Sequence, residues 1–192
     1  MGLDERIYRA LYGGDVAGAL TLVMLALSFV GGGWSAIVLG PLVAVPRTRR
    51  FALALTAAVI LQAVVVFAMK FAVGRVRPWL ALGMHPPIAA PPTDFSFPSG
   101  HASGSFTVAA FVATVCLSTP AMRGRRSSAI FAITLALAIA FSRVYLGVHY
   151  PGDVSAGALL GSAIGFVAAR VYCAKLRAHQ GAPLRANGDA RL

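Results

Sequence analysis

Acidic side chains are scarce in this chain of 192 residues, which has 6 Asp and Glu against 17 Lys and Arg. Charged residues of both signs make up only 12% of the sequence, about half the share that soluble domains carry. There is no carboxylate cluster that would hold a metal ion. The two cysteines, Cys116 and Cys173, lack the spacing of a zinc site. The sequence therefore predicts no metal and no cofactor.

The net charge of +11 raises the question of a nucleic-acid partner. The basic residues, however, cluster in the gaps between apolar runs, which is the pattern that sets membrane topology. No platform of interleaved aromatic and basic residues supports binding to nucleic acid. The sequence therefore predicts a membrane as the partner, and no nucleic acid.

Hydrophobic residues make up 58% of the chain, and several apolar runs approach the roughly 20 residues that cross a bilayer. One small soluble domain could not bury so many apolar runs. We therefore expect an all-α, polytopic membrane protein with six transmembrane helices. The predicted spans cover about residues 16–31, 34–46, 51–72, 99–119, 129–146 and 151–172.

The weakest part of this plan is the stretch 16–45, which is long for one span and short for two. Two spans place all but four of the 17 Lys and Arg residues on one side, as the positive-inside rule favours. The prediction is therefore a six-helix membrane domain over 16–173, with both termini cytoplasmic. Residues 1–15 are expected to form an interfacial helix, and residues 174–192 a basic, disordered cytoplasmic tail.

Two of three short motifs contain the four exceptions, which are Lys70, Arg75, Arg77 and Arg143. The motifs are Lys70 to Pro78 ("KFAVGRVRP"), Pro98 to His101 ("PSGH") and Ser142 to Asp153 ("SRVYLGVHYPGD"). No predicted span separates the first motif from the second, and two spans separate the second from the third. All three should therefore face the same side of the membrane, which is the periplasmic or extracellular side.

This combination predicts a site for a phosphate group. The planar guanidinium of arginine matches the spacing of phosphate oxygens, and lysine supplies a point charge. Lys70, Arg77 and Arg143 could therefore hold the oxygens of a phosphate. Ser99 and Gly100 open a helix whose first N–H groups point at an anion. An ordinary helix cap is the plainer interpretation of Ser-Gly, but it does not explain the cations and histidines nearby.

Two histidines and a carboxylate suggest chemistry at that phosphate. Asp153 lies four residues after His149 and could hold one ring nitrogen, which leaves the other nitrogen nucleophilic. His149 would then attack phosphorus in line, while His101 would protonate the leaving oxygen and later activate water. The cations would stabilise the developing charge without a metal.

These motifs are complete and resemble those of the type 2 phosphatidic acid phosphatase superfamily, which also includes bacterial acid phosphatases, glucose-6-phosphatase and vanadium haloperoxidases. The resemblance covers residues 70–153. It implies the same roles: His149 as nucleophile, His101 as acid and base, and Asp153 as the orienting partner. The one departure is the compact N-terminal pair of spans, which concerns the lipid entrance rather than the chemistry. The phosphate ligands that the resemblance implies are Lys70, Arg77, Ser99, Gly100 and Arg143.

The position of the motifs at helix ends favours a lipid phosphate. The resemblance offers undecaprenyl diphosphate, phosphatidic acid, phosphatidylglycerol phosphate and lipid A phosphate, and the short loops favour undecaprenyl diphosphate or a broad lipid phosphatase. Two alternatives are a phosphotransferase of the same family and a non-enzymatic anion-binding protein or transporter. His85 and Asp94 are interpreted as solvated loop residues, with a substrate contact as the alternative. Arg75 would steer an anionic head group or contact a lipid phosphate.

Overall fold

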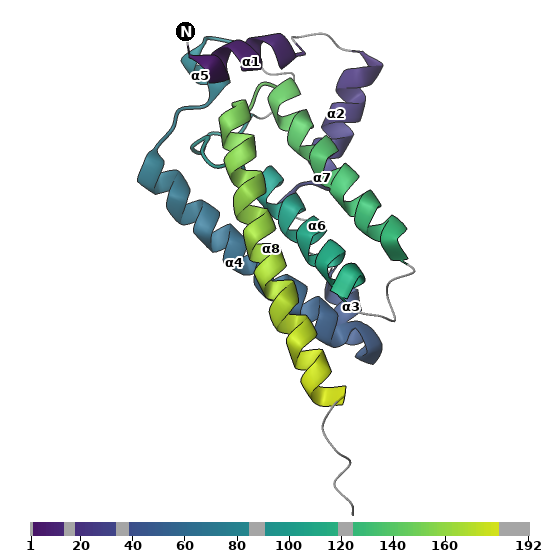
Figure 1. The fold of residues 1–192 in the computed structure, drawn as a ribbon. Coiled ribbons are helices and arrows are strands. Elements are labelled where there is room, and N and C mark those ends of the chain that lie inside the picture. The colour runs from purple at the N-terminus through teal and green to yellow at the C-terminus, as the bar shows by residue number, and fades with distance from the viewer. Residues whose placement is uncertain (1, 14–17, 34–38, 85–90, 119–124, 181–192) are drawn as a thin grey trace, which may run out of the picture.

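The computed structural model describes residues 2–13, 18–33, 39–84, 91–118 and 125–180, and every regular element among them is helical. Figure 1 shows how the long helices form a bundle, with one short helix lying across its end. In chain order the helices are α1 (Leu3–Leu11), α2 (Ala19–Val30), α3 (Leu39–Ala44), α4 (Pro46–Val73), α5 (Pro78–Ala81), α6 (Gly100–Ser118), α7 (Arg126–Tyr145) and α8 (Pro151–Gln180).

Four of these helices, α4, α6, α7 and α8, are long and apolar enough to cross a membrane. Their outward faces carry large hydrophobic side chains, among them Phe67 and Phe131, which are 64% and 68% exposed. Such faces would be unfavourable in water but match the hydrocarbon of a bilayer. The all-helical, multi-pass membrane architecture expected from the composition is therefore confirmed.

The helices α6 and α8 pack more closely than any other pair because glycines line the contact. A Cβ added to Gly161 would lie 2.0 Å from the Ser103 carbonyl oxygen, and one added to Gly165 would lie 2.3 Å from that of Thr107. Small residues at four-residue spacing let membrane helices approach backbone to backbone. This contact fixes the start of α6 against the start of α8, where two of the three motifs lie.

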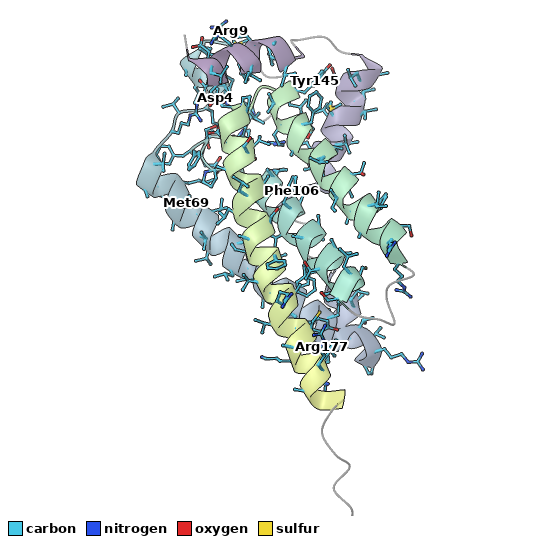
Figure 2. All side chains as sticks on the ribbon, viewed as in Figure 1. Asp4, Arg9, Met69, Phe106, Tyr145 and Arg177 are labelled. Carbon is cyan, nitrogen blue, oxygen red and sulfur yellow. The ribbon has the colours of Figure 1, made fainter. Side chains whose placement is uncertain are left out.

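The short helix α1 lies across the end of the bundle at which α8 begins. Its fully buried Tyr8 donates a hydrogen bond to the Gly147 carbonyl at 3.3 Å. The Asp4 carboxylate accepts one from the Gly152 amide at 2.7 Å. Figure 2 places Asp4 at this end and Arg177 of α8 at the other. The prediction that both chain ends lie on one side, opposite the motifs, is therefore wrong for the N-terminal helix.

The difference arises between residues 19 and 46, where two crossings were expected. Helix α2 starts beside the motif end, because the Thr21 hydroxyl lies 3.4 Å from that of Tyr145. Helix α3 packs against α4 at the far end of the bundle. The chain thus passes from one end to the other over this stretch, and the six-span count is not confirmed. Helix α8 also continues to Gln180, so residues 174–180 of the predicted tail are helical, and residues 181–192 lie outside the described part.

The glycine contact can be tested by adding a single methyl group. Gly161→Ala should destabilise the protein by about 1–3 kcal/mol, because the new Cβ overlaps the α6 backbone. Gly104→Ala is the control, since its Cβ would lie 3.7 Å from Gln62 in ordinary contact and gains the same helix propensity. Thermal unfolding in detergent should show a lower Tm for Gly161→Ala only. Equal Tm values for the two variants would contradict the close α6–α8 approach.

Candidate active site

The three motifs meet at the end of the bundle covered by α1. Helix α4 ends at Gly74, whose φ of 63° gives the left-handed turn that glycine adopts most readily. This turn directs the following residues back over the bundle end, so that Arg77 reaches the loop between α7 and α8. All eight predicted site residues lie in this region, at the end of α4, before α5, at the start of α6, at the end of α7 and around the start of α8. The prediction that the motifs share one face is confirmed.

Arg77 and His149 form the centre of the site. Both side chains are buried, and Arg77 Nη1 lies 3.2 Å from His149 Nε2. A guanidinium can only donate hydrogen bonds, so Nε2 must be the acceptor and its lone pair faces the cation. The ring proton is then on Nδ1. Arg77 Nη1 also donates to the Val148 carbonyl at 2.7 Å, which fixes the guanidinium beside the ring.

Ser96 connects His149 to Asp153. The Ser96 hydroxyl donates to Asp153 Oδ2 at 2.5 Å and lies 3.3 Å from His149 Nδ1, from which it can accept the ring proton's hydrogen bond. The direct distance from His149 Nδ1 to Asp153 Oδ2 is 3.6 Å, which is too long for a hydrogen bond. The expected link between histidine and aspartate is therefore present, but it runs through a serine that the motifs did not indicate.

Burial keeps the His149 ring neutral. Its side chain is 2% exposed, and loss of hydration lowers the pKa of His149 to about 3, against the smaller opposing effect of Asp153. The nearby Arg77 cation acts in the same direction as burial. At neutral pH, Nε2 therefore carries an electron pair rather than a proton, as a nucleophile requires, and here that pair accepts the hydrogen bond from Arg77.

Asp153 is completely buried and its two oxygens are held separately. Oδ1 accepts from Arg75 Nη1 at 2.7 Å, and Oδ2 accepts from Ser96 and, at 2.9 Å, from the Tyr150 amide. Arg75 also donates to Asp4 at 2.6 Å and so links α1 to the site. Arg75 is therefore paired with two carboxylates, and the expectation that it would bind a lipid head group does not fit these contacts.

The Asp94 carboxylate forms ion pairs with two of the predicted phosphate-binding cations. Its carboxylate lies 2.5 Å from Arg77 Nη2 and 3.0 Å from Lys70 Nζ, and Lys70 also donates to the Phe95 carbonyl. Burial alone would raise the pKa of the Asp94 carboxyl, but the Lys70 and Arg77 contacts hold it below its ordinary value. The interpretation of Asp94 as a solvated loop residue is therefore wrong, although half of its side chain is exposed.

The third cation, Arg143, approaches from the end of α7. It is 3% exposed and donates to the Ser28 hydroxyl of α2. Its Nε is buried and has no hydrogen-bond partner among the described residues. A buried cationic donor without an acceptor is costly, so this atom points to an anion that binds beside it.

The start of α6 contributes Ser99, Gly100 and His101. The Ser99 amide donates to the Asp153 carbonyl at 3.0 Å, and its hydroxyl oxygen accepts weakly from Ala102 at 3.5 Å. The Ser99 amide is therefore already used, and the Ser99 hydroxyl is the group that can donate a hydrogen bond to a phosphate. The His101 ring is close enough to Arg143 and His149 to interact with both electrostatically. His85 lies outside the described residues.

Two site residues, Ser96 and Asp4, were not predicted from the sequence, and a third, Arg75, was expected in another role. Ser96 lies between two phenylalanines and resembles any loop hydroxyl, so no signal marked it. Arg75 did carry a signal, because it is two residues from Arg77 in the extended stretch after Gly74. Asp4 could not be found, since its partners lie more than 70 positions away.

The fold and the site together define an all-helical membrane protein with buried cations and a neutral histidine at one end of its bundle. The chain belongs to the PAP2 superfamily, whose family model matches residues 51–177. The resemblance found in the motifs is thereby confirmed.

Named relatives agree with this assignment. An undecaprenyl-diphosphatase of Sulfolobus acidocaldarius is 34% identical over 125 residues, which cover 65% of this chain but only 57% of that protein. A decaprenylphosphoryl-5-phosphoribose phosphatase of Mycobacterium tuberculosis is 34% identical over 151 residues, which cover 77% of this chain and 76% of that protein. The crystal structure of a transmembrane PAP2-type phosphatidylglycerolphosphate phosphatase from Bacillus subtilis superposes with a TM-score of 0.71. It covers 95% of this chain and 87% of that one at 24% identity, which shows a shared fold.

The contacts of Asp94 give a binding prediction that does not depend on activity. Asp94→Asn removes a carboxylate that competes for Lys70 and Arg77, so inorganic phosphate should bind about fivefold more tightly, as a partly exposed pair worth about 1 kcal/mol implies. Isothermal titration of the purified protein with phosphate measures this directly. The control is Glu5→Gln, which removes a carboxylate of α1 that pairs with Arg9 instead. Unchanged or weaker phosphate binding by Asp94→Asn would contradict competition by this carboxylate.

Proposed function

We propose that this protein is an integral membrane lipid phosphatase that cleaves a phosphomonoester or diphosphate of a lipid through a phosphohistidine at His149. The observation that carries the proposal is the neutral, fully oriented imidazole whose Nε2 lone pair faces Arg77. Membership of the PAP2 superfamily and the names of the relatives support the same activity.

The first step is attack of His149 Nε2 on phosphorus. The phosphate displaces the Asp94 carboxylate. The phosphate oxygens then accept hydrogen bonds from Lys70, Arg77 and Arg143, and from the Ser99 hydroxyl and Gly100 at the start of α6. As the P–N bond forms, the imidazole becomes positively charged, and Asp153 stabilises that charge through Ser96. The bond to the leaving oxygen breaks, and His101 supplies the proton that this oxygen needs.

The second step is hydrolysis of the phosphohistidine. His101, now neutral, takes a proton from water, and the hydroxide so formed attacks phosphorus on the side the leaving group has vacated. The P–N bond breaks, inorganic phosphate forms, and His149 recovers its lone pair. Three buried cations supply the charge stabilisation that a metal ion provides in other phosphatases.

The position of the site supports a lipid substrate. It lies at the end of four apolar helices, so a head group bound there leaves its hydrocarbon tail beside the bundle. The basic segments at 47–50 and 125–126 lie at the opposite end, which favours a cytoplasmic position for that end and an outer position for the site. Recycling of a polyprenyl diphosphate carrier fits such a site, with glycerophospholipid and lipid A phosphates as the other candidates.

Two other outcomes belong to the same site. A lipid phosphotransferase would pass the phosphoryl group from His149 to a lipid hydroxyl instead of water, and analysis of labelled products distinguishes the two. A non-enzymatic anion-binding protein would use the cations alone. That alternative leaves the chain of hydrogen bonds from His149 to Asp153 without a purpose.

The mechanism predicts the effect of removing the nucleophile. Purified protein should release phosphate from at least one of undecaprenyl diphosphate, phosphatidic acid, phosphatidylglycerol phosphate and lipid A, with EDTA present. His149→Ala should lower the rate at least 10³-fold, because the covalent route is lost. Release that needs a metal ion, or that persists in the variant, would contradict the phosphohistidine route.

Ser96 gives a second kinetic prediction. Ser96→Ala breaks the connection to Asp153 and should lower kcat about tenfold to a hundredfold, as loss of a hydrogen bond to a charged partner implies, with KM little changed. Ser96→Thr keeps the hydroxyl and should restore most of the rate. The acid limb of the pH–rate profile should also shift in Ser96→Ala, which a purely structural role would not produce. Equal rates for the Ala and Thr variants would contradict the bridge.

A further inference from the structure

A groove lies between α4 and α8 near the end of the bundle that is remote from the catalytic residues. Its volume is about 590 Å³, and its walls are apolar except at one place. Alanines form much of its floor, because side chains that stop at Cβ leave space between the two helices. They are Ala54, Ala57, Ala58 and Ala168.

Two cations, Arg50 and Lys175, line the same groove, one from each helix. Both side chains are exposed. Arg50 lies in the second turn of α4, and Lys175 lies near the other end of the groove's second helix, α8. An apolar trough with a pair of cations beside it has the shape and charge of a phospholipid, with acyl chains along the trough and a phosphate at the cations.

The distance along the helices separates this groove from the catalytic site. Arg50 and Lys70 are 20 residues apart on α4, which corresponds to about 30 Å of helix and to the hydrocarbon thickness of a bilayer. Figure 2 places Asp4 at one end of the bundle and Arg177, two residues after Lys175, at the other. A ligand whose charge sits at Arg50 therefore belongs to the leaflet opposite the catalytic site.

We propose that this groove binds an anionic diacyl phospholipid of the opposite leaflet, with its phosphate on Arg50 and Lys175 and one acyl chain between α4 and α8. The hydrocarbon tail of the substrate could enter the groove from the catalytic side, but a tail carries no charge for the two cations. The bound lipid would join the first half of α4 to the last half of α8, and so brace the two helices that carry Lys70 and Asp153. The proposal does not depend on the phosphatase activity.

The test compares lipids with the same acyl chains and different head groups. Purified full-length protein in a non-ionic detergent receives phosphatidylglycerol or phosphatidylcholine, and native mass spectrometry and thermal unfolding report binding. Phosphatidylglycerol should be retained and should raise Tm, with an apparent affinity about tenfold higher than that of phosphatidylcholine. Equal retention and equal Tm shifts for the two lipids would overturn the proposal.

Variants locate the binding. The double variant Arg50→Gln/Lys175→Gln should lose the preference for phosphatidylglycerol about tenfold. The control Arg49→Gln/Arg177→Gln removes the same charge from the same helix ends outside the groove, and its lipid-induced Tm shift should stay within twofold of wild type. An equal loss of phosphatidylglycerol preference in the control variant would show that general surface charge causes the effect, and it would overturn the proposed site.

A second variant keeps the charges and fills the trough. Ala57→Phe should weaken retention of phosphatidylglycerol at least fivefold, although Arg50 and Lys175 remain. Unchanged retention would show that the acyl chain lies elsewhere. An uncharged polyprenol should displace phosphatidylglycerol only weakly, and strong displacement would identify the substrate tail as the occupant instead.

Discussion

The buried carboxylate of Asp153 is the group on which the rest of the site depends. A fully buried charge is tolerated only when every oxygen is paired, because its hydration is lost. Here Arg75 neutralises one oxygen, while Ser96 and a backbone amide satisfy the other. These partners come from the turn after α4, the loop before α6 and the start of α8. Pairing this one charge therefore brings three separate segments to a single point.

The glycine contact between α6 and α8 makes that pairing possible. It sets the two helix starts so close that the Ser99 amide reaches the Asp153 carbonyl. At the level of the site the contact is made by Gly157, where an added Cβ would lie 2.6 Å from the Ser99 carbonyl oxygen. A larger residue there would separate the helix starts and stretch the 2.5 Å hydrogen bond from Ser96 to Asp153. Helix α1 adds a further constraint, since Asp4 holds Arg75 from outside. The N-terminal helix is thus part of the architecture of the site, and its Tyr8 also packs on Tyr150, the residue after His149.

The sequence predicted the parts of this protein that local chemistry encodes. Apolar runs indicated the long helices. The motif cations marked the site because they break the positive-inside rule, and two histidines accompany them. The roles of Ser96 and Asp94 could not be predicted in this way, since they depend on distances set by the tertiary fold. The prediction of the N-terminal topology was wrong for a related reason. The positive-inside rule counted Arg9 as a free charge, whereas it pairs with Glu5 on a helix that docks onto Gly147 and Gly152.

The Asp94 carboxylate explains how buried cations coexist at a site that we propose binds a phosphate. Lys70 and Arg77 are both buried, and without a counter-charge they would repel each other in a medium of low dielectric constant. The half-exposed Asp94 carboxylate stands in for a phosphate, with one oxygen on each cation. A phosphate that enters exchanges one anion for another, so it does not bear the full cost of dehydrating the cations. In the proposed mechanism, a phosphate dianion outcompetes a single carboxylate because it also reaches Arg143, whose Nε has no acceptor among the described residues. The site can therefore stay folded before substrate arrives and still favour phosphate over a carboxylate.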